Sequence, residues 1–157
     1  MVELLVVVAI IAIIAVIAVP GMLRARTAAN EASIIGSMRA INTSQQNYAQ
    51  QCMGFAPVLT ELRLAGNLLS PDLTSAASVL KSGFIVTMVP AATALAIPFP
   101  AAGCVGTTTN YYVTAVPLKF GSTGTRSFAT TDQATIFYTT TAIPPADPIP
   151  PGTSPIQ

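Results

Sequence analysis

The chain has no histidine and no tryptophan, and only 8% of its 157 residues are charged, with a formal net charge of +1. The missing histidine removes the side chain that most often serves proteins as a general base and metal ligand. The low charge leaves no basic patch of the kind that marks nucleic-acid-binding proteins. Composition therefore argues against nucleic acid as a partner and against histidine-based catalysis.

Cysteine is scarce as well, because Cys52 and Cys104 are the only two. The chain has no CxxC or CxxCH pattern, which excludes a zinc ribbon and the covalent attachment of a c-type haem. In an exported domain the two cysteines would form one disulfide. That bond would close a loop of about 50 residues and stabilise the fold by about 4 kcal/mol in the chain-entropy model. Two buried free thiols are the alternative.

Motifs of enzyme active sites are also missing. No GxSxG sequence and no glycine-rich phosphate loop occurs. The six acidic residues are widely separated and form no paired-carboxylate motif; they are Glu3, Glu31, Glu61, Asp72, Asp132 and Asp147. Two acids near the C-terminus are too few to predict a site for a hard cation. We therefore expect no catalytic, cofactor-binding or metal site, and the protein is not predicted to be an enzyme.

What the chain does have is a long hydrophobic run near its N-terminus. The sixteen residues from Leu4 to Val19 are all Leu, Val, Ile or Ala. As a helix rising about 1.5 Å per residue, segment 1–23 would reach roughly 34 Å, enough to cross the hydrocarbon core of a bilayer. Lipid offers no hydrogen bonds to the backbone, so a spanning segment of this kind must be helical.

The residues that flank this run differ from those of a simple membrane anchor. Glu3 precedes it, Pro20-Gly21 follows it, and Arg24 and Arg26 come next. A carboxylate at mid-bilayer costs about 2.5–3.5 kcal/mol, and less near the interface. A secretory signal would carry its basic residues before the run. A helix that sits in a membrane and also packs against its own copies would explain Glu3, which could pair with a neighbour's amino terminus and fix the register.

This arrangement resembles the N-terminal helix of type IV pilins and of type II secretion pseudopilins. In that family an acid precedes a long apolar run and a proline stands 17 positions after the acid, a spacing that Glu3 and Pro20 keep. The resemblance is close over about the first 50 residues and looser from Tyr111 to Tyr138. It implies a pilin-like α+β fold, in which a long N-terminal helix packs on a small antiparallel sheet. It also implies processing by a prepilin peptidase and uptake by the pilus assembly machinery.

The start of the chain departs from the family pattern. Pilins have four residues before the acid, whereas Met1 and Val2 alone precede Glu3 here. We therefore expect Met1 to be a position inside the mature helix, with the methylated N-terminal residue upstream. In filaments of the family the helix can also melt around the proline. Because Pro20 removes a backbone donor and Gly21 adds freedom, we predict a break between Ala12 and Leu23, with a simple kink as the alternative.

The segment 24–52 is amphipathic. Its apolar residues recur at helical spacing on one stripe, which consists of Ile34, Met38, Ile41, Tyr48 and Cys52. This pattern predicts a helix half that buries the stripe against a sheet.

Polar residues of the same segment are weaker signals. Arg24, Arg26 and Glu31 lie just after the apolar run, where they would contact neighbouring subunits or form a solvated face. Asn42-Thr43-Ser44 matches an N-glycosylation sequon, which is a weak signal on a helix.

Residues 53–143 are expected to form a globular β domain. Two short helices are predicted at Val58–Ala65 and Asp72–Lys81. Strands are predicted at Phe84–Val89, Tyr111–Val116, Ser127–Thr130 and Ala134–Thr139, as an antiparallel meander on the amphipathic helix half.

Two segments of the chain fit neither helix nor strand. Residues 90–106 are apolar and interrupted by proline, which favours either a contact between subunits or a buried crossover pinned by Cys104. The tail, 144–157, holds six prolines in fourteen residues. We expect the tail to be extended, with no core of its own.

These features predict a major pilin, a structural subunit that waits in the bacterial inner membrane and then polymerises with its own copies into an extracellular filament. The alternative is a type II secretion pseudopilin, which forms a short periplasmic pseudopilus. A minor ligand-binding tip pilin and a membrane-anchored enzyme are less favoured. Adhesion, motility, DNA uptake and conduction all use similar subunits.

Overall fold

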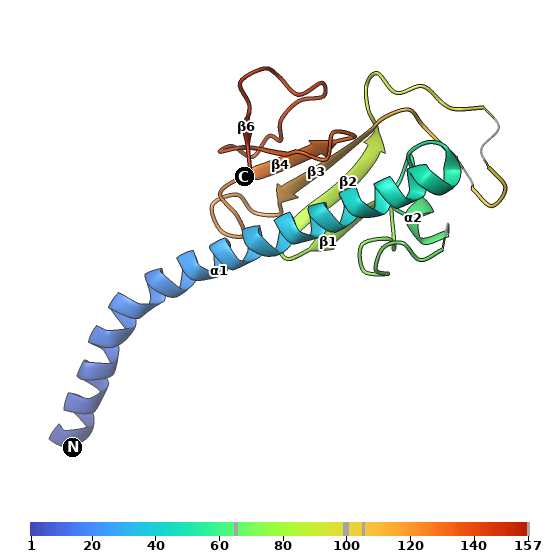
Figure 1. The fold of residues 1–157 in the computed structure, drawn as a ribbon. Coiled ribbons are helices and arrows are strands. Elements are labelled where there is room, and N and C mark those ends of the chain that lie inside the picture. Colours follow the sequence, from blue (N-terminus) through green and yellow to red (C-terminus); the bar gives the residue numbers. More distant parts are fainter. Residues whose placement is uncertain (65, 99–100, 105, 157) are drawn as a thin grey trace.

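A long helix and an antiparallel sheet make up the computed structural model, which describes residues 1–64, 66–98, 101–104 and 106–156. The second half of helix α1 (Val2–Cys52) lies along one face of the sheet, and its first half projects beyond the domain (Figure 1). The predicted α+β class, with a long N-terminal helix on a small antiparallel sheet, is confirmed.

The sheet is a meander in which each strand pairs with the next one along the chain. Its six strands are β1 (Ser78–Lys81), β2 (Phe84–Pro90), β3 (Tyr111–Pro117), β4 (Ser127–Thr131), β5 (Ile136–Thr139) and β6 (Ser154–Pro155). The four strands expected from the sequence are therefore present as β2 to β5. Strands β1 and β6 extend the sheet at its two edges.

The core lies between α1 and the sheet. The predicted stripe of α1 is confirmed, since all five of its side chains, from Ile34 to Cys52, are fully buried. They meet the alternate residues of the strands that point toward the helix, among them Phe84, Met88 and Val113. Gln45 lies within this apolar stripe, and its amide group exchanges two hydrogen bonds of 2.9 Å with the backbone of Ala56.

The predicted break between Ala12 and Leu23 is not present, because α1 is continuous from Val2 to Cys52 with Pro20 inside it. The first half of the helix curves away from the domain (Figure 1), as helices do around an internal proline. Pro20 removes one hydrogen bond, while the turns on both sides keep theirs. Within a single chain this loss bends the helix without ending it.

The segment between α1 and β2 corrects two predictions. Helix α2 (Glu61–Leu64) lies within the predicted span Val58–Ala65 but is shorter; Ala65 itself lies outside the described residues. The helix predicted at Asp72–Lys81 is wrong, because this segment forms turns and then β1. The cause is the turn at Ser82-Gly83, where both residues have positive φ, of 50° and 75°. Such a two-residue turn joins antiparallel strands and so pairs β1 with β2.

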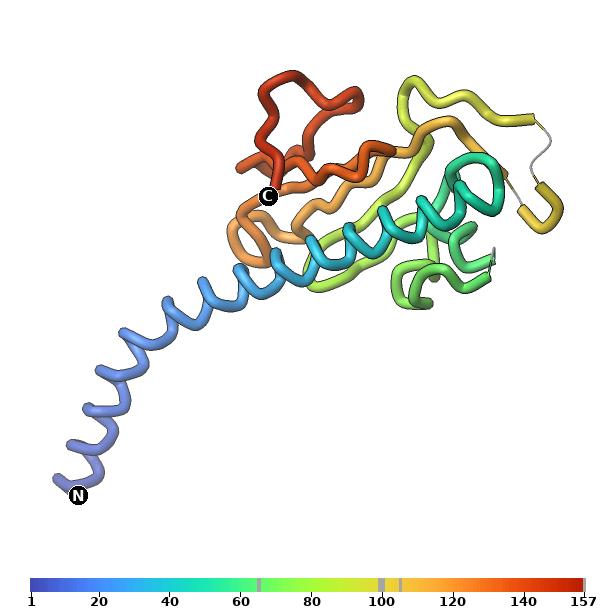
Figure 2. Tube along the Cα trace, in the orientation of Figure 1, coloured from blue at the N-terminus to red at the C-terminus, as the bar shows by residue number. Residues whose placement is uncertain are grey.

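The proline-rich tail is also different from its prediction, because it docks on the sheet. Ile149 packs against Tyr112 and Ala129, which point away from α1. The hydroxyl of Tyr112 donates to the carbonyl of Pro145, and the short β6 pairs with β5. The tail thus covers part of the sheet face opposite α1 (Figure 2).

The expected disulfide joins Cys52 at the end of α1 to Cys104 in the connection between β2 and β3, with Cα atoms 5.8 Å apart. This connection is both pinned and exposed. Ile97 donates to the carbonyl of Thr107 at 2.9 Å, whereas the side chain of Leu95 is 70% exposed. The pinning by Cys104 expected of residues 90–106 is therefore present, but the described part of this segment is not a buried crossover, because almost all of its residues are exposed or partly exposed. A contact between subunits through it stays a prediction.

Replacing both cysteines, as Cys52→Ala with Cys104→Ala, should lower the free energy of unfolding by about 4 kcal/mol. The reason is that the reduced chain gains freedom in a loop of 52 residues. The measurement is urea unfolding of the full chain in detergent, with and without a reductant. The reductant should shift the wild-type midpoint and leave that of the double variant in place. Equal wild-type midpoints under both conditions would contradict a structural role for the bond.

Candidate assembly surface

The first half of α1 exposes a continuous apolar surface. The most hydrophobic 18-residue window of the helix is 0% buried, and by length and composition α1 can cross a membrane. Exposure of its large apolar side chains from Val2 to Leu23 runs from 51% at Val6 to 77% at Val2. Such a surface is unfavourable in water by about 25 cal/mol for each Å². Lipid or protein must therefore cover it, which is compatible with membrane anchoring.

Glu3 is the one charged side chain between Met1 and Leu23. It lies in the first turn of α1 and is exposed. The positive end of the helix dipole favours an acid at this position. Neither of the two ion pairs found between described residues involves Glu3. Its carboxylate is therefore open to a partner outside the subunit.

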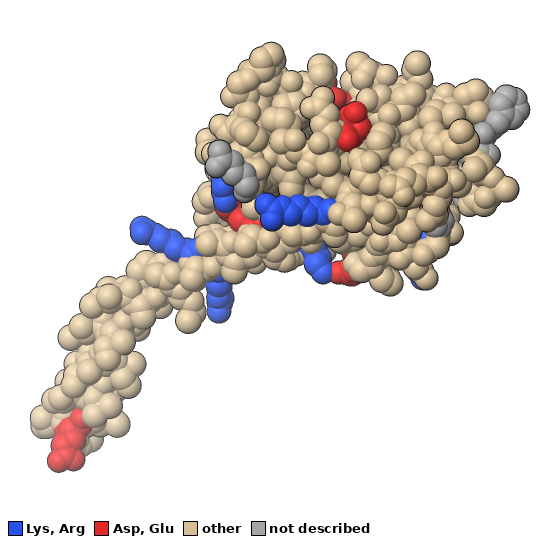
Figure 3. Space-filling view, in the orientation of Figure 1, with Lys and Arg blue, Asp and Glu red and all other residues tan. Residues whose placement is uncertain are grey.

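The apolar surface ends at a polar and basic junction. Arg24 and Arg26 are exposed where α1 approaches the domain, and Figure 3 shows basic side chains gathered there. The hydroxyl of Thr27 donates to the carbonyl of Arg24 at 2.8 Å. A side chain at Gly21 would meet nothing within 4 Å. The junction thus leaves both arginines free to make contacts outside the subunit.

Glu31 has a different role from the other residues at this junction. Its side chain is 7% exposed, and one carboxylate oxygen accepts from the Thr125 backbone N–H at 2.7 Å and from its hydroxyl at 2.8 Å. The other oxygen accepts from Arg126 at 2.8 Å. Burial alone would raise the pKa of Glu31, but the hydrogen bonds from Thr125 and the charge of Arg126 lower it. Both alternatives expected for Glu31, a subunit contact and a solvated face, are corrected to a contact within the subunit.

The same contacts fasten the β3–β4 loop (residues 118–126) to α1. Besides the Glu31 contacts, the amide of Asn30 donates to the carbonyl of Thr123 at 3.2 Å. Arg126 also lies over the rings of Phe128 and Tyr138, at 5.5 and 5.2 Å from their centroids. The sequence indicated only that Glu31 follows the apolar run, and nothing in it pointed to a partner 95 residues away.

Asn42, the first residue of the sequon, is buried rather than available to a sugar. Its amide nitrogen donates to the Thr130 hydroxyl and to the carbonyl of Ala134, both at 3.0 Å. Its amide oxygen accepts from the Tyr111 hydroxyl at 3.1 Å. These bonds tie α1 to the β3 and β4 strands, so Asn42 is a structural residue.

In the described part of the domain, the buried polar side-chain atoms have hydrogen-bond partners except for one oxygen of Glu61. Its Oε2 atom is buried and has no hydrogen-bond partner there. Burial raises the pKa of Glu61, and the same carboxylate helps to raise the pKa of Tyr48. The negative charge of Glu61 is therefore unfavourable in the folded state.

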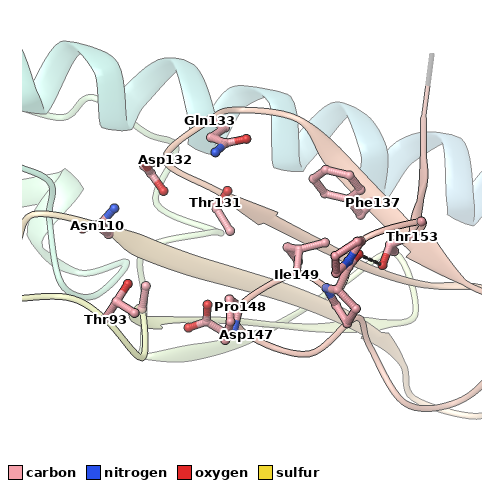
Figure 4. A pocket seen from close by; sticks show the side chains of 14 residues that line it. Thr93, Asn110, Thr131, Asp132, Gln133, Phe137, Asp147, Pro148, Ile149 and Thr153 are labelled. Carbon is pink, nitrogen blue, oxygen red and sulfur yellow. Dashed lines mark hydrogen bonds between the residues drawn. The ribbon is translucent and has the colours of Figure 1, made fainter.

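A cavity of about 420 Å³ lies between the tail and the end of the β4–β5 hairpin. Asp132 and Asp147 are its two acidic lining residues, and they come from the hairpin and the tail (Figure 4). One oxygen of Asp147 already accepts from the backbone N–H of Ala92 at 2.5 Å. No group of three or more potential metal ligands occurs among the residues that the structure describes. Residues 147–153 of the docked tail form one wall of this cavity.

Comparison with known proteins gives no match: no family model, no curated protein and no solved structure is similar to this chain. Of the residues singled out in the sequence, the structure places Glu3, Pro20, Gly21, Arg24 and Arg26 on the exposed part of α1. Glu31 and the two cysteines lie in contacts within the domain.

Replacing Glu31 by Gln should destabilise the fold at neutral pH by about 1.5–3 kcal/mol, the usual worth of hydrogen bonds to a charged group. The pKa of Glu31 is lowered in the folded state, so the unfolded chain binds the proton more tightly. The stabilisation is therefore fully present above about pH 4.5 and is lost as the pH falls through the lowered pKa. Thermal unfolding followed by circular dichroism in detergent, between pH 3 and 7, measures both effects. A variant with the wild-type acid dependence would refute this role.

Replacing Glu61 by Met should have the opposite effect. It removes a buried oxygen without a partner, and we expect a gain of about 1 kcal/mol at neutral pH, the lower end of the cost of such an atom. Because the pKa of Glu61 is raised in the folded state, the penalty grows as the pH rises above about 4.5. The same unfolding series should show the gain at pH 7 and little or none at pH 4. A loss of stability at pH 7 would mean that Glu61 has a favourable partner.

Proposed function

We propose that this protein is a type IV pilin-like structural subunit, which polymerises through the first half of α1 into an extracellular helical filament. The inner membrane holds the subunit before assembly, and the helices form the filament core afterwards. The observation that supports this proposal is the fully exposed apolar half of a helix that continues without interruption into a folded domain.

The shape of the subunit favours a polymer over a simple anchor. An anchor needs a spanning segment but no fixed relation between that segment and the domain. Here a single helix of 51 residues forms both the spanning segment and the part that packs on the sheet. A bundle of the apolar halves would therefore hold the domains around it in a fixed orientation.

The position of Glu3 supports the same proposal. A carboxylate on the apolar half is costly in lipid, a cost that the helix dipole offsets only in part. Between helices it can pair with a neighbour's amino terminus and set the axial register of the filament. Arg24 and Arg26, exposed at the other end of this half, are available for contacts with lipid or with neighbouring subunits.

A type II secretion pseudopilin is the alternative, since it would use the same helix in a short periplasmic assembly. Electron microscopy of filaments sheared from the cells, with mass spectrometry of their main component, distinguishes the two. Long fibres built mainly of this chain would support a major pilin. A chain found only in the membrane fraction, or as a trace in fibres of another protein, would favour the pseudopilin or a minor subunit.

Replacing Glu3 by Leu should leave a stable membrane protein that assembles poorly, because the charge that sets the register is gone. The yield of sheared filaments measures assembly, and the amount of protein in the membrane fraction measures stability. A matched control moves the charge by one position, as Glu3→Leu with Leu4→Glu, and should not restore assembly. Normal filament yield from either variant would rule out the pairing of Glu3.

A further inference from the structure

We propose that the β3–β4 loop is a second membrane contact, which docks on the headgroups of an anionic lipid bilayer beside the spanning helix. The inference rests on the membrane-anchored stage of the proposed function and adds a lipid-binding surface to it. It concerns the subunit before assembly, and filament formation plays no part in it.

The loop exposes a basic residue between two apolar ones. Leu118 is 58% exposed and Phe120 is 41% exposed, and Lys119 between them is exposed as well. Aromatic and aliphatic side chains next to a lysine suit the membrane interface, where the rings and the lysine stem lie in the apolar boundary and the charge reaches the headgroups.

The loop lies at the level where α1 would leave the membrane. Gly121 and Ser122 line the same surface groove as Leu23, Arg24 and Thr27. From Leu23 to Thr27 the helix rises about 6 Å. The headgroup layer on each side of a bilayer is about 5–8 Å thick. If the hydrocarbon core ends near Leu23, the tip of the loop lies within the headgroup layer.

The charge of this region matches an anionic surface. Arg24, Arg26 and Lys119 are exposed here. The acid that the structure places at the junction, Glu31, is buried and paired with Arg126, so it does not offset them. Each Lys or Arg near an anionic surface strengthens binding by about fivefold. The three together favour phosphate headgroups over neutral ones.

The loop is held in place and does not need to be ordered by the membrane. Thr125 and Arg126 donate hydrogen bonds to Glu31 of α1. The carbonyl of Thr123 accepts one from Asn30, the residue before Glu31. At the start of the loop, the N–H of Leu118 donates to the carbonyl of Gly83 at 2.9 Å. Docking therefore costs little conformational entropy, and the contact fixes how the domain rotates about α1 over the membrane.

The chain has no tryptophan, so a single introduced Trp reports on one position. We would reconstitute Phe120→Trp into vesicles that carry bromine-labelled lipids, made either with phosphatidylglycerol or with phosphatidylcholine alone. The matched control is Leu95→Trp, at a residue that is 70% exposed in the β2–β3 connection at the other end of the sheet (Figure 1). Flotation of the vesicles shows that each variant is bound to them. Leu118→Trp serves as a second reporter if Phe120→Trp does not fold.

We expect lipid quenching to reduce the emission of Phe120→Trp at least twofold in phosphatidylglycerol vesicles, with weaker quenching in phosphatidylcholine and none for Leu95→Trp. Adding Lys119→Gln should weaken the contact about fivefold. Salt at 1 M should weaken it further, because the Debye length falls to about 3 Å and all three basic residues are screened.

Three results would count against the inference. If the vesicles carry the protein but the tryptophan of Phe120→Trp emits as a residue in water does, the contact is overturned and the proposed function is left intact. Equal quenching in both lipids would overturn the role of the basic residues. A chain that does not float with the vesicles would contradict the membrane stage itself, and the loop contact with it.

Discussion

The packing of the second half of α1 on the sheet is the contact on which the other features of this protein depend. Ile34, Met38 and Ile41 are fully buried there, and the helix continues from them through Pro20 to Val2 without interruption. The direction in which the apolar half leaves the domain is therefore set inside the domain core. A flexible linker at the same place would have left two independent parts.

The junction between the two halves is stiffened by polar contacts rather than by apolar packing. Glu31 holds the loop before β4 with three hydrogen bonds and an ion pair. Because this carboxylate is almost fully buried, its partners are worth more than those of an ion pair on the surface. The contact also keeps an acid away from the exposed arginines, so the end of the domain nearest the apolar half is basic on its surface.

Much of the fold could be predicted from the sequence because its signals are local. The apolar run, the stripe of segment 24–52 and the alternating strands each follow one period, and β2 to β5 begin and end near the predicted residues. The prediction of a helix at Asp72–Lys81 was wrong because β1 depends on pairing with β2 through the Ser82-Gly83 turn. The prediction for the tail was wrong for a related reason, because docking depends on contacts with distant residues. Proline lacks an N–H donor, but its carbonyl still accepts a hydrogen bond, as that of Pro145 does from Tyr112.

The candidate site was predictable in part for the same reason. Glu3, Pro20 and the two arginines belong to one linear motif, so their order along the chain already places them on one helix. Glu31 and Asn42 could not be assigned, since their partners lie about 90 residues further along the chain. From the sequence alone, a carboxylate close to an apolar run is expected to be a surface charge. Glu31 is buried because the β3–β4 loop packs against α1 at this position.

The proposed assembly places a physical limit on where its specificity can lie. Moving the apolar half of α1 from lipid to a bundle of similar helices exchanges one apolar environment for another, so the hydrophobic effect supplies little net driving force. What distinguishes a correct register from a shifted one must then be the charge of Glu3, the one polar side chain on this half, and the surfaces of the domains. Because the helix is continuous, a pairing made by Glu3 at one end fixes the height of the domain at the other. The register of the core and the packing of the domains would therefore be one property rather than two.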